Sequence, residues 1–498
     1  MTTSFIRSVL LHGEQTARRL ALTLFAAIVL LYCGLIGLGQ WQADEYADFS
    51  QLEYGVRAVA NRLRWSPRPL SEPIFLGYGW LTIRFQRPLT PLFLGLLWAC
   101  LAGAALSTLW LRRQSDYDRD ETWLDALSGV SLMAAFLTAG PLTQVFYWPA
   151  GAVAYLPTLS GTLFLFLQVA SGSLDTSIGR MRCGIALMIA ALSSETGAVF
   201  VASFALVMAM YAIAKRLGRD FGSWDLRPQS WCVLPALVSA GVLLAMLFNR
   251  FRAAEPVSQR ASATLGHPAA SAMAATVDLV ADIFGLGPHV HGWFLFNPQF
   301  FSVALLAFGI GLCWNQTHAI PERTRSDLGC LASGLLLGSI FTLAACYIHF
   351  GQAVEERHRL IILCWIRLAL ASIAVAVLGS NRARHLREHR VLRVLGPVLI
   401  VCGVVIVWHL KPLVREYRAY GAVRKTTKDN FRSGFAPGSS QIVWGIPANR
   451  GVITPATIEA GTYHRTSPSD FPSYILMYFK KDTLVVRSPA EQWGQVSP

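Results

Sequence analysis

The sequence carries little charge, which excludes an ordinary soluble globular protein. Of its 498 residues, 14% are Asp, Glu, Lys or Arg and 53% are hydrophobic, whereas soluble domains carry about 25% charged residues. A bilayer core of about 30 Å requires roughly 20 apolar residues per helix. Backbone polar groups inside lipid must be paired within their own segment, so such spans are helices. The composition therefore predicts an all-α polytopic membrane protein.

Several common catalytic motifs are also absent. The chain has no G-x-x-x-x-G-K-[ST], no G-x-G-x-x-G at a strand–helix turn, no H-E-x-x-H and no G-x-S-x-G. Its nine cysteines form no C-x-x-C and lie within or beside apolar stretches, which argues against a disulfide framework and a cysteine metal site. We therefore expect no direct use of a cytoplasmic nucleotide, and any donor substrate is expected to arrive already activated.

Long apolar stretches predict about eleven transmembrane helices. They lie at about 20–39, 90–111, 123–139, 152–170, 181–194, 196–214, 232–248, 299–314, 328–348, 360–379 and 394–410. The first is expected to be an uncleaved helix, because no cleavage site follows it at a suitable distance. Basic residues flank both ends of 183–214, so Ser193–Gly197 is predicted to turn the chain and to divide this stretch into two short helices.

The net charge of +14 indicates membrane topology rather than nucleic-acid binding. The arginine clusters between the apolar stretches are all predicted to lie on the cytoplasmic side, together with the N-terminus. An odd number of helices then places 411–498 outside as a small C-terminal domain, after a transmembrane domain over 1–410. Long external loops are predicted at 40–88 and 249–298.

The loop 40–88 opens with the first candidate residues, Asp44 and Glu45. A carboxylate near a membrane surface suits a general base that takes the proton of an acceptor hydroxyl. An ordinary solvated loop start without a role is the alternative. The loop also carries arginines on the side where topology disfavours them. These are Arg57, Arg62, Arg64, Arg68, Arg84 and Arg87.

Arg68 is the arginine that the local sequence constrains most strongly. Prolines at 67, 69 and 73 stiffen the chain around it, and a guanidinium suits a phosphate because its fork donates two hydrogen bonds. The sequence therefore predicts a phosphate-binding role. An amphipathic loop that lies on lipid headgroups is the alternative.

A second basic cluster, Glu355–Arg359, leads into the apolar stretch 360–379. Arg357 and Arg359 are candidates for binding a lipid phosphate and stabilising it as a leaving group. Arg367 lies two turns further along and shares a helical face with Arg359 to within about a quarter turn. Snorkelling combined with a structural ion pair to a neighbouring glutamate is the alternative.

Trp148, Tyr155 and Glu195 are the candidates for binding a sugar or an acceptor. Aromatic rings stack on sugars, but Trp and Tyr also gather at membrane interfaces, which is the alternative for the two aromatic residues. Glu195 lies in the predicted turn, where it either contacts sugar hydroxyls or caps a helix.

The loop 249–298 contains two carboxylates and two histidines at short spacings, Asp278, Asp282, His289 and His291. None of these spacings is diagnostic of a metal site. An interfacial helix with a solvated acidic face is the preferred interpretation.

In this arrangement the chain resembles the GT-C superfamily of polyprenyl-phosphate-dependent membrane glycosyltransferases. The resemblance is architectural over most of 1–410, and short motifs carry it: the acidic pair at the start of the first external loop, the aromatic and acidic residues of later outer loops, and the arginines of a late helix. It implies a multi-pass protein of the bacterial inner membrane with its active site on the outer face. The W-W-D-type motif of oligosaccharyltransferases is absent, which argues against protein N-glycosylation.

The resemblance implies that a sugar moves from a polyprenyl-phosphate donor to an envelope glycan or lipid acceptor. Asp44 is then the expected base with Glu45 as its neighbour or substitute, and Arg357, Arg359 and Arg68 bind the donor phosphate. The expected partners are this donor, the acceptor and membrane lipids, and nucleic acid is not expected. No cofactor is assigned, and dependence on a divalent metal stays open.

Two other functions remain open at the level of sequence. A transporter or flippase of a lipid-linked anionic substrate would use the arginines but would need no base. A non-catalytic factor for envelope assembly would need neither.

Overall fold

The computed structural model describes residues 19–20, 22–111, 119–140, 142–216, 230–252, 273, 276–277, 280, 320–350, 356–379, 391–446, 452–453, 458–465 and 471–487. The predicted apolar stretch 299–314 lies outside these residues, as do the candidate metal ligands Asp278, Asp282, His289 and His291.

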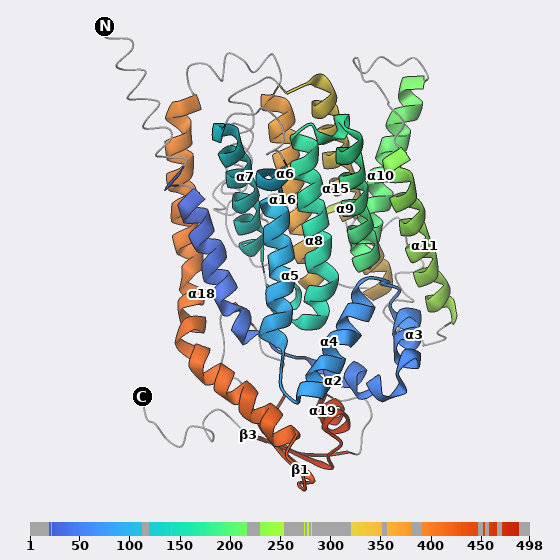
Figure 1. Ribbon diagram of the computed structural model, residues 1–498, viewed down its shortest axis with the longest axis vertical. Helices are drawn as coiled ribbons and strands as arrows, with labels where there is room; N and C mark the ends of the chain where they lie inside the picture. Colours follow the sequence, from blue (N-terminus) through green and yellow to red (C-terminus); the bar gives the residue numbers. More distant parts are fainter. Residues whose placement is uncertain are drawn as a thin grey trace. The chain divides into compact units, whose positions relative to one another are not determined.

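The described chain is mostly helical and divides into two compact units (Figure 1). Unit 1 comprises 1–30, 100–140 and 157–408, and unit 2 comprises 31–99, 141–156 and 409–498. Three helices have residues in both: α5 (Thr90–Ala105), α8 (Pro149–Ala170) and α18 (Val391–Gly434).

Among the described residues, five helices are long and apolar enough to cross a membrane. They cover Pro149–Ala170, Glu195–Ala214, Ser230–Phe248, Glu322–Cys346 and Glu356–Leu378. Leu22–Leu38 and Ala43–Ser50 add a sixth if this pair, bent by 52°, forms one broken span. These helices agree with the predicted α-helical membrane protein, whereas the predicted number of about eleven spans is not confirmed.

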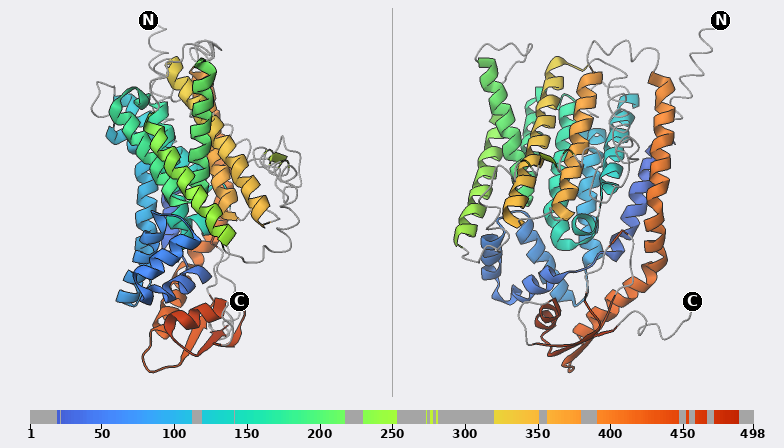
Figure 2. Two further views of the ribbon diagram at one scale, coloured as in Figure 1. Left: turned by 90° about the vertical axis from the view of Figure 1, so that its right-hand side faces the viewer. Right: turned by 180° about the vertical axis from the view of Figure 1, so that it is seen from behind.

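Unit 1 is built from helices. They are α6 (Ser107–Leu111), α7 (Arg119–Leu137), the short turn η4 (Ser173–Asp175), α9 (Ser177–Ser193), α10 (Glu195–Arg216), α11 (Ser230–Arg252), α15 (Glu322–Phe350) and α16 (Glu356–Leu378). Helix α15 packs against both α10 and α16 (Figure 2). A Cβ atom added at Gly334 of α15 would lie 2.9 Å from the Cα atom of Phe204 on α10. Small residues of this kind let helix backbones approach closely in a membrane.

The predicted division of 183–214 is present as two helices, α9 and α10, which meet at Ser194. The Ser194 hydroxyl accepts a hydrogen bond from the backbone N–H of Gly197 at 3.0 Å. It also shares hydrogen bonds with the hydroxyls of Thr158 at 2.7 Å and Thr196 at 3.0 Å. Ser194 therefore caps α10, because its side chain satisfies a donor at the helix start.

Arg367 of α16 is buried, and its hydrogen-bond partners belong to the same unit. Its guanidinium donates to the carbonyl oxygens of Ala135 at 2.6 Å and Thr138 at 3.4 Å. These carbonyls lie at the C-terminal end of α7, where backbone acceptors lack helical partners and a cation is favoured. The arginine that sequence analysis placed on the face of Arg359 thus holds α16 against α7.

In unit 2, most of the predicted loop 40–88 is helical. After the short turn η1 (Leu35–Leu38) come α2 (Ala43–Ser50), the turn η2 (Leu52–Tyr54), α3 (Val56–Trp65) and α4 (Ser71–Phe85). A further turn, η3 (Thr143–Tyr147), precedes α8. Start signals are present at α2, which has a capping box, and at α4, which has Pro73 in its first turn.

The C-terminal part of unit 2 is a small α/β layer. A three-stranded sheet has the order β1-β3-β2, with β1 (Gln441–Gly445) parallel and β2 (Gly461–His464) antiparallel to β3 (Thr483–Arg487). Helix α19 (Phe471–Phe479) packs against α2. The apolar residues 474–479 lie in this helix.

Aromatic rings form the core between α2 and α19. Trp41 contacts the rings of Tyr46, Phe49, Phe431 and Tyr478 at centroid distances of 5.0 to 5.3 Å. Aromatic pairs add about 0.5–1.5 kcal/mol each beyond their buried area. This core fixes α2, which carries the acidic candidates.

Candidate functional site

The acidic pair opens helix α2 rather than a loop. Asp44 and Glu45 lie in its first turn, where carboxylates interact favourably with the helix dipole. The Glu45 carboxylate accepts a hydrogen bond of 2.8 Å from the backbone N–H of Gln42, the residue that precedes the helix. This contact is one half of a capping box and explains why the helix begins here.

Glu45 is fully buried, with 0% of its surface exposed. Besides Gln42, its carboxylate accepts hydrogen bonds from the indole N–H of Trp148 at 2.8 Å and the backbone N–H of Ala150 at 3.0 Å. Burial raises the pKa of Glu45 to about 8, although these hydrogen bonds oppose the rise. The residue therefore ties α2 to the start of α8, and it is not exposed to solvent.

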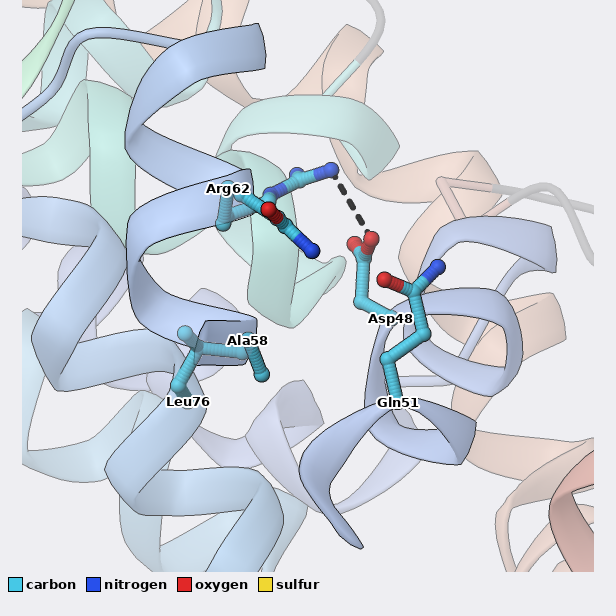
Figure 3. A pocket seen from close by; sticks show the side chains of 6 residues that line it. Asp48, Gln51, Ala58, Arg62 and Leu76 are labelled. Carbon is cyan, nitrogen blue, oxygen red and sulfur yellow. Dashed lines mark hydrogen bonds and ion pairs between the residues drawn. The ribbon is translucent and has the colours of Figure 1, made fainter. Parts of the chain in front are cut away.

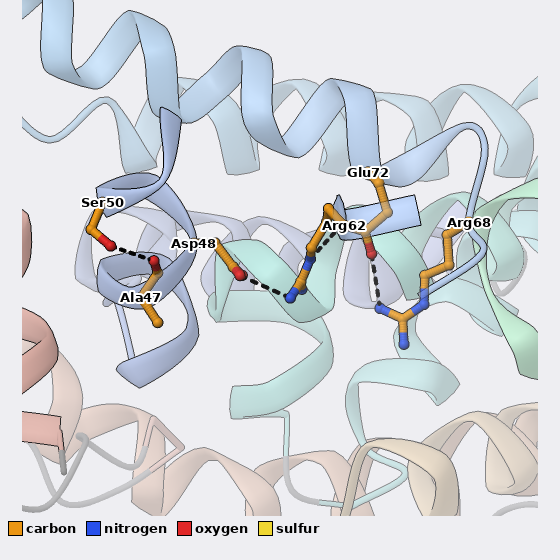
Figure 4. Close-up of polar contacts among 6 residues, drawn as sticks. All are labelled: Ala47, Asp48, Ser50, Arg62, Arg68 and Glu72. Carbon is orange, nitrogen blue, oxygen red and sulfur yellow. Dashed lines mark hydrogen bonds and ion pairs between the residues drawn. The ribbon is translucent and has the colours of Figure 1, made fainter. Parts of the chain in front are cut away.

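A chain of alternating charges runs from α2 to α4 (Figure 4). The Arg62 guanidinium of α3 lies 2.9 Å from a carboxylate oxygen of Asp48 and 2.8 Å from one of Glu72. Arg68 reaches the other Glu72 oxygen at 3.7 Å. Arg62 also lies over the ring of Phe75, 5.8 Å from its centroid. Three helices are thus joined through one arginine held between two carboxylates.

Asp48 is only partly buried, and its environment differs from that of Glu45. Burial raises its pKa to about 7, against the opposing charge of Arg62. Its Oδ1 atom pairs with Arg62, whereas the buried Oδ2 atom has no hydrogen-bond partner among the described residues. A carboxylate with a pKa near neutrality and one oxygen that is not hydrogen-bonded has the properties of a general base.

A pocket of about 270 Å³ opens beside this ion pair (Figure 3). Its lining combines charged, amide and apolar side chains: Asp48, Gln51, Ala58, Asn61, Arg62 and Leu76. In Figure 3 the carboxylate of Asp48 faces Arg62, and Gln51 projects beside it. The pocket therefore combines a carboxylate with groups that can position a polar ligand.

Asp44, the base expected from sequence, is exposed and lies one helical turn before Asp48. Its negative charge contributes to the raised pKa of Asp48. Asp48 is the residue of this pair that lines the pocket.

The other predicted residues fall into two groups. Within unit 2, Glu45 meets Trp148, and the Arg68 guanidinium lies over the ring of Tyr155 at 5.9 Å. Arg357 and Arg359 lie in the first turn of α16, half-buried, and Glu195 opens α10. These three belong to unit 1 and are part of neither pair.

Sequence analysis missed Asp48 and the central position of Arg62. The spacing of Asp44 and Asp48 is i,i+4, which places them on one face if 43–50 is helical. The sequence predicts 43–50 as part of a long external loop, where this spacing has no significance, and Arg62 is only one of several arginines in that loop. Among the described residues, no group of three or more His, Cys, Asp or Glu side chains is arranged to hold a metal ion.

Comparison with known proteins gives no similar chain. No family model matches, and neither curated protein sequences nor solved structures provide a match.

Proposed function

We propose that this protein is a membrane glycosyltransferase, which moves a sugar from a polyprenyl-phosphate donor to an envelope glycan or lipid acceptor. The observation that carries the proposal is Asp48, a partly buried carboxylate that lines a pocket and has a pKa of about 7. Helices long enough to cross a membrane are consistent with a lipid-linked donor.

In the proposed reaction, an acceptor hydroxyl gives its proton to the carboxylate of Asp48, which lines the pocket. The acceptor oxygen forms the new bond to the anomeric carbon of the donor sugar. The bond between that carbon and the phosphate oxygen breaks, and its electron pair leaves with polyprenyl phosphate. Asp48 suits the first step because a base works best when its pKa lies near the working pH.

Arg62 is proposed as a positioning residue. Its N–H groups are bonded to Asp48 and Glu72 on either side, so it holds the carboxylate that acts on the acceptor. Arg68 is proposed to bind the donor phosphate, and Arg357 and Arg359 remain candidates for the same task. Cations near the leaving group stabilise the charge that develops on it.

The proposal includes a location. We place the protein in a bacterial inner membrane, with the N-terminus cytoplasmic and the C-terminus periplasmic. The distribution of arginines in the sequence supports this orientation.

Mass spectrometry of envelope glycans from cells that lack the protein tests the proposal. Re-supplied wild type is expected to restore one missing sugar, and Asp48→Asn, which keeps the side chain's shape, is expected to lower transfer about 100-fold or more. Asp44→Asn is the matched control on the same helix face and is expected to restore the sugar. Membrane content and size-exclusion profile confirm that each variant folds.

Two other outcomes would contradict the proposed base or the proposed function. Loss with Asp44→Asn but not with Asp48→Asn would return the base to the residue favoured by sequence. Full rescue by both variants together with loss in Arg68→Ala would contradict the transferase and favour a transporter or flippase, which needs cations but no base.

A further inference from the structure

Two amide side chains in the Asp48 pocket have no role in the proposed chemistry. Gln51 directly follows α2 and Asn61 lies on α3, and both are exposed while lining the pocket. Among the described residues neither side-chain amide makes a hydrogen bond, in contrast to the neighbouring charged groups. Both amides can therefore form hydrogen bonds with a ligand that enters the pocket.

The chemistry of this lining matches a polyhydroxylated ring. Each amide offers two N–H donors and one carbonyl acceptor. One of two neighbouring sugar hydroxyls can accept a hydrogen bond from the N–H group, and the other can donate to the carbonyl oxygen. Ala58 and Leu76 supply apolar surface on the same pocket, which suits the C–H face of a sugar. Binding sites commonly combine an apolar lining with a few polar groups that fix orientation.

The charges of the pocket favour an uncharged ligand. The Asp48 carboxylate and the Arg62 guanidinium are paired at 2.9 Å, and Arg62 is bonded to Glu72 as well. A sugar acid would face the Asp48 carboxylate, and the one guanidinium of the lining is already paired with Asp48 and with Glu72. The volume of about 270 Å³ lies just below the range of about 300–1,000 Å³ that is usual for drug-sized ligands, so one ring fits better than an oligosaccharide.

We propose that this pocket binds one uncharged sugar ring, and that the amides of Gln51 and Asn61 select it through its hydroxyls. The proposal rests on the proposed transferase function and narrows its substrate class. It leaves the source of the ring, donor or acceptor, to the experiment.

The test uses the full chain in lipid nanodiscs and saturation-transfer NMR with free monosaccharides as probes. Glucose, galactose, mannose and arabinose represent uncharged sugars, glucuronic acid represents sugar acids, and glucosamine represents amino sugars. We expect transfer of saturation to at least one uncharged sugar and none to glucuronic acid. The double variant Gln51→Met, Asn61→Leu, which keeps side-chain size but removes both amides, is expected to lose at least 80% of this signal.

Gln441→Met is the matched control. It makes the same chemical change at an exposed residue of β1 in the same unit, and it should leave the signal unchanged. The proposal is overturned if no uncharged sugar receives saturation, if the double variant keeps the wild-type signal, or if glucuronic acid or glucosamine binds more strongly than every uncharged sugar.

Transfer kinetics of the double variant separate the two sources of the ring. A raised KM for the lipid-linked donor with an unchanged acceptor KM assigns the pocket to the donor sugar, and the reverse assigns it to the acceptor. Unchanged values for both would contradict the proposal while leaving the transferase intact. Full rescue of the glycan by Asp48→Asn would contradict the transferase, while the NMR result would still decide whether the pocket binds a sugar.

Discussion

Two carboxylates three residues apart on α2 show how surroundings decide the role of a side chain. Glu45 is fully buried and Asp48 is partly buried, and burial raises the pKa of each. Three N–H donors occupy the oxygens of Glu45, so its loss would leave buried donors unpaired, at about 1–3 kcal/mol each. Asp48 keeps one oxygen without a partner among the described residues and lies at a pocket. The first carboxylate is suited to structure and the second to chemistry.

The rate of transfer is expected to depend on pH through Asp48. A general base works in its ionised form, and below a pKa of about 7 the ionised fraction falls about tenfold per pH unit. The rate should therefore fall at this slope on the acidic side and level off on the alkaline side. Initial rates of the purified protein with its identified donor, measured from pH 5 to 9, check this.

The Asp44→Asn variant provides a second test of this pH dependence. The negative charge of Asp44 helps to raise the pKa of Asp48, so its removal should move the midpoint of the profile to lower pH while the plateau rate stays. A profile that is flat through pH 7 in the wild type would argue against Asp48 as the base.

The sequence supplies candidates for the site but not their partners. The acidic pair, Arg68 and the aromatic residues are candidates from sequence, and none of them lines the pocket beside Asp48. The contacts of Glu45 with Trp148 and Ala150 join positions more than 100 residues apart, and a single sequence contains no signal for such pairs. Asp48 was hidden for a different reason, because its significance depends on helical spacing within 43–50.

At the scale of elements, the apolar stretches of the sequence correspond to helices of unit 1, because backbone polar groups in lipid must be paired within a helix. The same signal is weak for α2 and α3, which lie beyond the first apolar stretch and are mixed in polarity. Their form depends on caps and on packing against α19 and α4. The helical extension of α18 to Gly434 likewise exceeds the apolar stretch that ends near 410.

Helix packing in unit 1 gives a prediction for stability. A Cβ atom added at Gly129 of α7 would overlap the carbonyl oxygen of Ala105 at the end of α5, a backbone atom that has little freedom to move. Gly129→Ala is therefore expected to destabilise the protein by about 1–3 kcal/mol. The measurement is the apparent melting temperature of the detergent-purified protein.

Gly103→Ala is the control for this prediction. The position lies within α5, and a Cβ atom there would have no heavy atom within 4 Å. Because Ala is the better helix former, the control should leave the melting temperature unchanged or slightly raised. Equal effects of the two substitutions would show that close packing at Gly129 is not the cause.

At the scale of the whole molecule, unit 2 gathers three separate stretches of chain, 31–99, 141–156 and 409–498. Tyr46 of α2 has ring neighbours from the last of them, with centroid distances of 5.8 Å to Trp444, 5.6 Å to Tyr478 and 6.2 Å to Phe479. The C-terminal layer is therefore part of the support of the candidate site.

Removal of 435–498 is expected to abolish sugar transfer while the protein remains in the membrane. The reason is that the truncation takes Trp444, Tyr478 and Phe479 away from α2, so the helix that carries Asp48 loses its cover. Glycan mass spectrometry measures the first effect and membrane fractionation the second. Lys480→Ala is the control, because its ion pair with Glu53 is exposed and such pairs contribute about 0–1 kcal/mol. Restoration of the sugar by the truncated chain would show that the layer serves another purpose.

The surroundings of α2 depend on residues that are synthesised much later than the helix itself. Glu45 accepts hydrogen bonds from residues 103 and 105 positions further along the chain, and Tyr46 packs on a helix that spans 471–479. While the ribosome is still translating the middle of the message, α2 has neither its final hydrogen-bond donors nor its aromatic cover. The carboxylates therefore reach their native surroundings late, after 471–479 has been synthesised, and incomplete chains carry an unassembled site.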